Sequence, residues 1–279
     1  MTTRTSGVAG LPYLGSGLGY REELKDAIFA ARGAIDFLEI VTEQFLEHPQ
    51  GLDELRRICD VYPVIPHGLG LSIGSASGVR REYLSKIKRI SDVTDAPYYS
   101  EHLCMTSAPG IEIGHLSPLA LTEDVLRRAI ANVRVVQETL EKPLVLENVT
   151  YLFSIPGEQM TQPEFFAQLV EATGCGVLLD VTNVFINATN HGFEALRFLS
   201  SLPLESVVQV HLAGGHWSRD VLVDSHSALV QEESWELFDA LVARTAVRAS
   251  IIEHDAGFPD EFGTLIDQVA RARSIMRAR

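Results

Sequence analysis

The stretch "LVLENVT", residues 144–150, places a carboxylate directly after a run of apolar residues. Burying Glu147 at the end of such a run is costly unless the charge finds partners. The same arrangement recurs along the chain, in segments that end their apolar runs on a carboxylate or an imidazole: "YPVIPHGLG" (62–70), "YYSEHL" (98–103), "GVLLDVTN" (176–183), "VVQVHLAGG" (207–215) and "ASIIEHD" (249–255). Each run therefore delivers a group that can bind a metal ion or move a proton.

The spacing of these runs predicts the fold. Strand-like segments alternate with helical patterns, which is typical of a (β/α)8 TIM barrel. The segments are expected at 8–14, 36–42, 62–68, 97–103, 143–149, 176–182, 206–212 and 249–255. We expect one barrel domain over residues 1–279. The alternative is a doubly wound open sheet, but Gly15, Gly17 and Gly19 form G-x-G-x-G instead of the G-x-G-x-x-G of a dinucleotide loop.

Composition excludes several classes of protein. The 279 residues carry a formal net charge of −14, which repels phosphate backbones and argues against nucleic acid as a partner. No apolar run approaches the ~20 residues that span a bilayer, so no membrane association is expected. The N-terminus does not resemble a signal peptide. Three scattered cysteines favour neither a disulfide framework nor a thiolate zinc site, and we expect a cytoplasmic location.

A barrel explains the carboxylates and imidazoles, because the carboxyl ends of its strands meet at one rim where active sites form. These ends bring together as predicted metal ligands His67, His102, Glu147, Asp180, His211 and Glu253. The set exceeds the needs of one ion and contains no thiolate, which favours a cluster of iron, manganese or zinc bridged by carboxylates. Glu147, His211 and Asp180 are the predicted catalytic groups.

Other polar residues extend this site. Asp224 and His226 follow the seventh strand as a further metal position or as support for the ligands. Asn148 and Asn183 are predicted to orient ligands, with Asn183 also a candidate ligand. A shift of one residue would replace His102 with its neighbour Glu101, or Glu253 with His254, as the inward group. Taken singly, each strand-end residue would more often be a hydrogen-bonding or helix-capping group.

Longer motifs give a family resemblance. The chain is similar to the multinuclear non-heme iron-dependent oxidative enzymes, the DUF692 or UPF0276 family, in the segments "HGLGLSIGS" (67–75), "SEHL" (100–103), "LEN" (146–148), "GCGVLLDVTNVFINATN" (174–190), "VHLAGGH" (210–216) and "DSHS" (224–227). The resemblance implies a xylose isomerase-like TIM barrel that holds two or three irons in mixed Fe(II)/Fe(III) valence and uses O2. It also implies a ribosomal precursor peptide as substrate, with cysteine the expected target, and a small leader-binding partner protein.

The resemblance also assigns roles. It makes the six strand-end residues iron ligands, with Glu147 bridging two irons and with Asp224 and His226 on a third. "EHD" (253–255) departs from the Glu-Trp-Asp of many relatives, and "LENVTYLF" (146–153) differs from their "LENPSSYL". We expect these departures to affect the choice of substrate.

Two other classes stay open at this stage. One is a divalent-metal sugar isomerase or epimerase, or an endonuclease IV-like hydrolase, since these barrels use the same ligand types. The other is a protein that stores or senses metal. Partner or peptide contacts are expected on the long connections 41–52, 104–120, 150–162 and 213–230, with Phe45, Tyr151, Phe153 and Trp217 as candidate contact residues.

Overall fold

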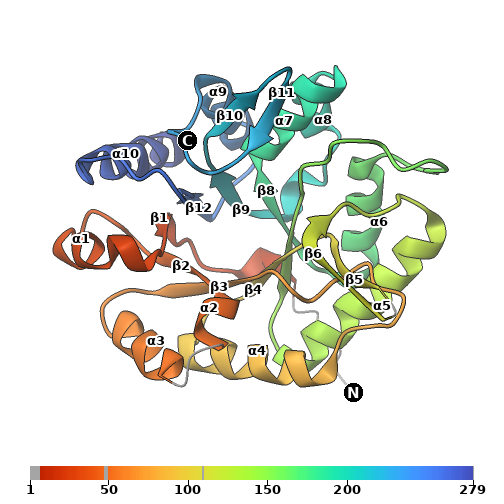
Figure 1. Ribbon diagram of the computed structural model, residues 1–279, viewed down its shortest axis with the longest axis horizontal. Helices are drawn as coiled ribbons and strands as arrows, with labels where there is room; N and C mark the ends of the chain where they lie inside the picture. The colour runs from red at the N-terminus through yellow and green to blue at the C-terminus, as the bar shows by residue number, and fades with distance from the viewer. Residues whose placement is uncertain (1–6, 47–49, 109, 279) are drawn as a thin grey trace.

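The computed structural model describes residues 7–46, 50–108 and 110–278, and its centre is a closed barrel of parallel strands (Figure 1). The order around the barrel is β1-β12-β9-β8-β7-β4-β3-β2. Its strands are β1 Gly15–Gly19, β2 Leu38–Val41, β3 Val64–Gly68, β4 Tyr99–His102, β7 Leu144–Glu147, β8 Gly176–Asp180, β9 Val207–Leu212 and β12 Ala249–Ile252. The predicted TIM barrel is confirmed.

Helices surround this barrel (Figure 1). They are α1 Lys25–Ala30, α2 Thr42–Leu46, α3 Gly51–Cys59, α4 Arg81–Thr94, α5 Glu123–Leu140, α6 Gln162–Thr173, α7 Val181–His191, α8 Ala195–Ser200, α9 Glu232–Val242 and α10 Gly263–Arg277, with short 3-10 helices at Val8–Gly10, Glu22–Leu24 and Leu204–Ser206. None of the described helices is long and apolar enough to cross a membrane.

Helix boundaries follow local chemistry. The hydroxyl of Thr122 accepts a hydrogen bond from Val125 N and begins α5. At α6, Thr161 and Glu164 form a capping box, and Gly174 ends the helix in the left-handed conformation. These caps fix the helices between the strands that carry the site.

Two connections expected as loops contain antiparallel hairpins. Strands β5 Met105–Ala108 and β6 Ile111–Ser117 follow β4, and strands β10 Gly215–Ser218 and β11 Val221–Asp224 follow β9. Asn190 of α7 holds the second hairpin, because its side chain donates to Leu222 O (2.8 Å) and accepts from Leu222 N (2.9 Å). The second hairpin thus presents Asp224 from a fixed position.

The prediction of a first strand over residues 8–14 is wrong. That segment is apolar because Val8, Leu11 and Leu14 pack against the core inside the barrel. The first strand is instead the glycine-rich segment that follows, β1. Glycine is needed there because a Cβ on Gly17 would lie only 2.5 Å from the carbonyl oxygen of Phe37, directly before β2. The glycines therefore serve strand packing in β1, and no nucleotide loop forms there.

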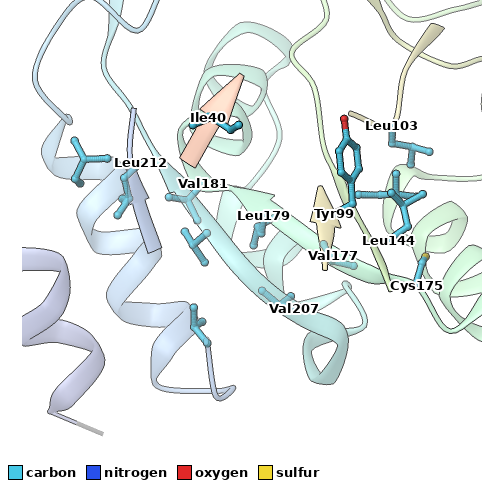
Figure 2. Packing of buried hydrophobic residues seen from close by; sticks show 14 of the residues in the cluster. Ile40, Tyr99, Leu103, Leu144, Cys175, Val177, Leu179, Val181, Val207 and Leu212 are labelled. Carbon is cyan, nitrogen blue, oxygen red and sulfur yellow. The ribbon is translucent and has the colours of Figure 1, made fainter. Parts of the chain in front are cut away.

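Alternation along each strand separates two cores. Outward residues such as Leu144, Val177 and Leu179 pack in the large cluster that includes the helices (Figure 2). Inward residues, which include Tyr98, Val145 and Leu178, form a smaller cluster inside the barrel. Following this alternation upward places the strand-end ligand candidates on the inward face, above the inner core.

Candidate metal centre

Glu147 lies at the centre of the predicted ligands. Its Oε2 is 3.2 Å from His67 Nε2 and 3.4 Å from His102 Nε2. Its Oε1 is 3.3 Å from His211 Nδ1. All four side chains are buried. The carboxylate thus has imidazole nitrogens near both of its oxygens, as the predicted bridging role requires.

The two histidines on Oε2 have their tautomers set by their other nitrogens. His102 Nδ1 is 3.0 Å from Gly68 O, which only accepts, so this nitrogen carries the proton. His67 Nδ1 is 3.0 Å from Ser100 Oγ, whose own hydroxyl donates to Pro66 O. When the rings are neutral, both Nε2 atoms therefore direct lone pairs at one carboxylate oxygen. Lone pairs gathered in this way repel one another unless a cation lies between them.

A second group of donors lies on the other side of Glu147. The ligand atoms of Glu147, Asp180, His211 and Glu253 all lie within 4.8 Å of one another. His211 Nδ1 is 3.0 Å from Glu253 Oε2. The structure thus brings together all six strand-end residues predicted as ligands, in two groups that share Glu147.

Sequence reasoning missed Glu39, which is buried behind His211. Glu39 Oε1 lies 2.8 Å from His211 Nε2, and Gln209 Nε2 lies 3.0 Å from the same ring nitrogen. A carboxylate oxygen at 2.8 Å would repel a bare lone pair, so Nε2 carries a proton and, in the neutral ring, Nδ1 is the lone-pair nitrogen facing the site. Gln209 donates to the other oxygen of Glu39, and Tyr98 OH donates to Gln209 Oε1 at 2.6 Å. The signal for Glu39 was available in the alternation of "DFLEI" (36–40), which places Phe37 and Glu39 on the same inward face.

The third group differs in part from the prediction. His226 Nδ1 lies 3.5 Å from Glu253 Oε2 and 3.3 Å from Asp255 Oδ2, and these three residues form a donor group. Asp224 Oδ1 lies instead against the opposite ring nitrogen, Nε2, at 2.8 Å without hydrogen-bond geometry. Asp255 was not predicted, and Arg21 Nε donates to it at 2.9 Å.

The two asparagines have separate tasks. Asn148 pins β7 to β8, because its side chain donates to Asp180 O (3.0 Å) and accepts from Asp180 N (2.9 Å). Asn183 Nδ2 donates to Asn148 O, and Asn183 N donates to Asp180 Oδ1. Asn183 Oδ1 is buried without a partner in the described part of the chain. Asn148 thus links the two strand ends, whereas Asn183 keeps an amide oxygen that could accept a hydrogen bond or coordinate a metal ion.

The alternative register is not adopted. Glu101 points away from the cup, where its carboxylate accepts from Leu71 N at 3.1 Å. Burial and the charge of Glu101 raise the pKa of the neighbouring Glu43 carboxyl. His254 likewise points outward, with its Nε2 3.2 Å from Gly257 O. His102 and Glu253 are therefore the inward members of their pairs.

The pKa shifts and the unpaired polar atoms show whether cations fit the cup formed by these strand-end side chains. Burial lowers the pKa of His102, but the carboxylates of Glu147 and Glu101 outweigh it and raise that pKa to about 9. Burial and the charge of Glu147 raise the pKa of Asp180 well above its usual range. Within the described residues, buried side-chain atoms without a hydrogen-bond partner include Glu147 Oε2, Asp180 Oδ2, His211 Nδ1, Asp224 Oδ1 and His226 Nε2. Unpaired acceptors gathered in one buried cup, all oxygen or imidazole nitrogen, fit metal ions such as iron, manganese or zinc.

Comparison with known proteins is consistent with this geometry. A family model described as "RiPP precursor modification enzyme MbnB/TglH/ChrH", for enzymes that modify ribosomally synthesised peptides, matches residues 15–277. The chain belongs to this family. A UPF0276 protein of Caulobacter vibrioides is 35% identical over 266 residues, covering 94% of this chain and 95% of that protein. A UPF0276 protein of Rhizorhabdus wittichii is 37% identical over 247 residues, covering 88% of each.

Solved structures show the fold that this chain shares with other barrels. A xylose isomerase domain protein from Planctomyces limnophilus matches with a TM-score of 0.57 at 11% identity, covering 96% of this chain and 99% of that one. The 3-keto-D-glucoside 4-epimerase of E. coli matches with a TM-score of 0.59 at 14% identity, covering 94% and 99%. At this identity the likeness is one of fold, and it confirms the predicted xylose isomerase-like barrel.

Proposed function

We propose that this chain is an iron- and O2-dependent enzyme that oxidises a cysteine of a ribosomally made precursor peptide. The observation that supports it is the arrangement of three donor groups in series, joined by Glu147 and Glu253. Family membership supplies the substrate class. A small leader-binding protein is part of the proposal as a partner, and two or three irons in mixed Fe(II)/Fe(III) valence as cofactors.

The irons would supply O2 activation and a Lewis-acid site for the peptide's side chain. His67, His102, Glu147, Asp180, His211 and Glu253 would hold two of them, and His226 with Glu253 and Asp255 would hold a third. The residues behind them keep the lone pairs aimed inward: Ser100 for His67, Gly68 O for His102 and Glu39 for His211. Glu147, Asp180 and His211 stay the proposed catalytic set because they lie where two of the donor groups meet.

The first test is metal content. Protein expressed with iron is analysed for metals and by Mössbauer spectroscopy, together with Glu147→Ala, His211→Ala and the exposed control Glu236→Gln. We expect two or more irons per chain in the wild type and the control, and loss of iron in both site variants. Zinc or manganese at full occupancy that iron does not displace would favour the isomerase, epimerase or endonuclease-like alternative.

The second test is chemistry on a peptide. The chain is co-expressed with each short open reading frame that flanks its gene, with and without a neighbouring small protein, and the peptides are weighed by mass spectrometry. We expect a mass change at a cysteine that requires O2 and disappears with Glu147→Ala. An iron-loaded chain that leaves every such peptide unchanged would refute the proposed reaction.

A further inference from the structure

A large groove lies beside the metal centre, on the side of the connection that follows β7. Its volume is about 810 Å³, within the range of ligand-binding clefts. Its walls come from the segment 149–164, from the α7–α8 connection and α8, and from the segment before α5. Apolar side chains line much of it, among them Leu121, Ile155, Met160, Phe193 and Phe198.

The inner wall of this groove is continuous with the strands that carry the ligands. Leu103 lines the groove and follows His102 directly, and Leu103 N donates to Glu147 O at 2.8 Å. Val149 also lines it, two residues after Glu147. A peptide bound in the groove would therefore contact the ends of the strands that carry the predicted metal ligands.

The wall formed by residues 149–160 is anchored at both ends. Asn187 donates to Val149 O (3.1 Å) and accepts from Tyr151 N (3.1 Å), and the Tyr151 ring stacks on His191. At the other end, Gln159 N and Met160 N donate to Leu121 O. Between these anchors Phe153, which lines the groove, is 70% exposed, and Ile155 lines it as well. A fixed wall with exposed apolar side chains suits binding of an apolar partner.

The charged residues around the groove indicate the charge of the partner. Glu158 and Glu194 are exposed on its lining, and their carboxylates make no hydrogen bond or ion pair with the described residues. Glu164 is already engaged in the cap of α6. Arg197 supplies a positive charge. The free carboxylates leave the groove with a net negative rim, which attracts cationic groups.

From these observations we propose that the groove binds an extended segment of the precursor peptide in which aromatic or aliphatic side chains are flanked by lysine or arginine. The inference rests on the proposed function, because it takes the peptide as substrate. The apolar side chains occupy the groove, and the basic residues pair with Glu158 and Glu194. Binding there leads the adjoining part of the peptide to the metal centre.

The test selects binding peptides from a random pool, so the natural substrate need not be identified first. Short peptides displayed on phage are selected on the purified iron-loaded chain, on the double variant Glu158→Lys/Glu194→Lys, and on the control Glu171→Lys/Glu236→Lys. The control has the same net charge as the variant, and both of its residues are exposed on helices outside the groove. We expect enrichment of apolar residues next to lysine or arginine on the wild type and the control, and its loss on the groove variant.

Affinity then gives the magnitude. A fluorescein-labelled copy of the most enriched peptide should bind the groove variant about tenfold more weakly in fluorescence anisotropy, since each exposed charge pair contributes modestly. Phe153→Ala should also weaken binding, whereas Trp217→Ala, which removes an exposed aromatic outside the groove, should not. Equal affinity for the groove variant and the control, or no enrichment on the wild type, would overturn the inference.

Iron content separates this inference from the proposed function. The groove variant should hold as much iron as the wild type, because none of its changes touches a ligand. If the chain holds iron but enriches no class of peptide, peptide binding in the groove is refuted and the proposed function is not. A chain that selects basic apolar peptides through Glu158 and Glu194 but binds no iron refutes the proposed chemistry and leaves the groove.

Discussion

Replacing Glu39 with glutamine should weaken metal binding at His211 although Glu39 belongs to none of the three donor groups. In the wild type, one oxygen of Glu39 lies 2.8 Å from the protonated His211 Nε2, and the other accepts from Gln209. Tyr98 OH donates to Gln209 Oε1 and so fixes which end of that amide faces Glu39. Both terminal atoms of the side chain at residue 39 must therefore be hydrogen-bond acceptors.

Glu39→Gln has one acceptor for these two donors. If its oxygen faces His211, its NH2 meets the NH2 of Gln209. If its NH2 faces His211, it favours the tautomer with the proton on Nδ1, the nitrogen directed at Glu147 and Glu253. Loss of such a buried orienting carboxylate typically reduces metal affinity about 10- to 100-fold, or about 1.4–2.8 kcal/mol.

The assay is a competition between the chain and a chromophoric chelator for Fe(II), with thermal unfolding followed by circular dichroism. Asp36→Asn is the matched control, because Asp36 is also a carboxylate held by hydrogen bonds, to Ser16 N and Arg273, but at the opposite end of the barrel. Unchanged iron affinity in Glu39→Gln, or an equal loss in Asp36→Asn, would refute the tautomer argument.

Three further predictions concern stability. Gly17→Ala should destabilise the barrel by about 1–3 kcal/mol in chemical denaturation, because its Cβ would lie 2.5 Å from Phe37 O; an unchanged midpoint would mean that β1 and β2 separate easily. Thr161→Ala removes the capping box of α6 and should cost about 1 kcal/mol by the same measurement, and restoration by Ser at this position would attribute the loss to the hydroxyl. The folded-state pKa of Glu43 is raised by burial and by the charge of Glu101, so the wild type loses stability as pH rises from about 4.5 through that pKa. Glu43→Gln cannot ionise, and its melting temperature relative to the wild type should rise over the same pH range; a parallel pH dependence of the two proteins would contradict this.

The sequence was sufficient to predict the barrel and the convergence of its strand ends, because both follow from patterns inside single segments. Strand β1 was missed because glycines are not typical of strands. The reason for these glycines is the close approach of the segment around Phe37, and that contact between residues far apart in the sequence cannot be read from β1 itself. Asp255 was missed because it lies beyond the end of β12 and reaches His226 only through the fold of the 225–227 segment. Phe45, expected as a contact residue, is buried in the core, whereas Phe153 and Trp217 are exposed; residues 47–49 of that first connection and residue 109 of the second lie outside the described residues.

The balance of charge in the cup argues for more than one cation. Glu39, Glu147, Asp180 and Glu253 are buried together, and Asp224 and Asp255 adjoin them. Arg21 is the buried cation in contact with this set among the described residues, and it reaches Glu253 and Asp255. The remaining negative charge must be offset by protons or by metal ions. Protons on the histidines would meet that need in the metal-free chain, as the raised pKa values of His102, His211 and His226 indicate. The outer nitrogens of His67, His102 and His211 already face Ser100, Gly68 O and Glu39, so in the charged rings the additional proton lies on the inward nitrogen, and metal binding has to displace it. The arrangement of the surrounding residues thus supports the proposal that the cup binds more than one metal ion.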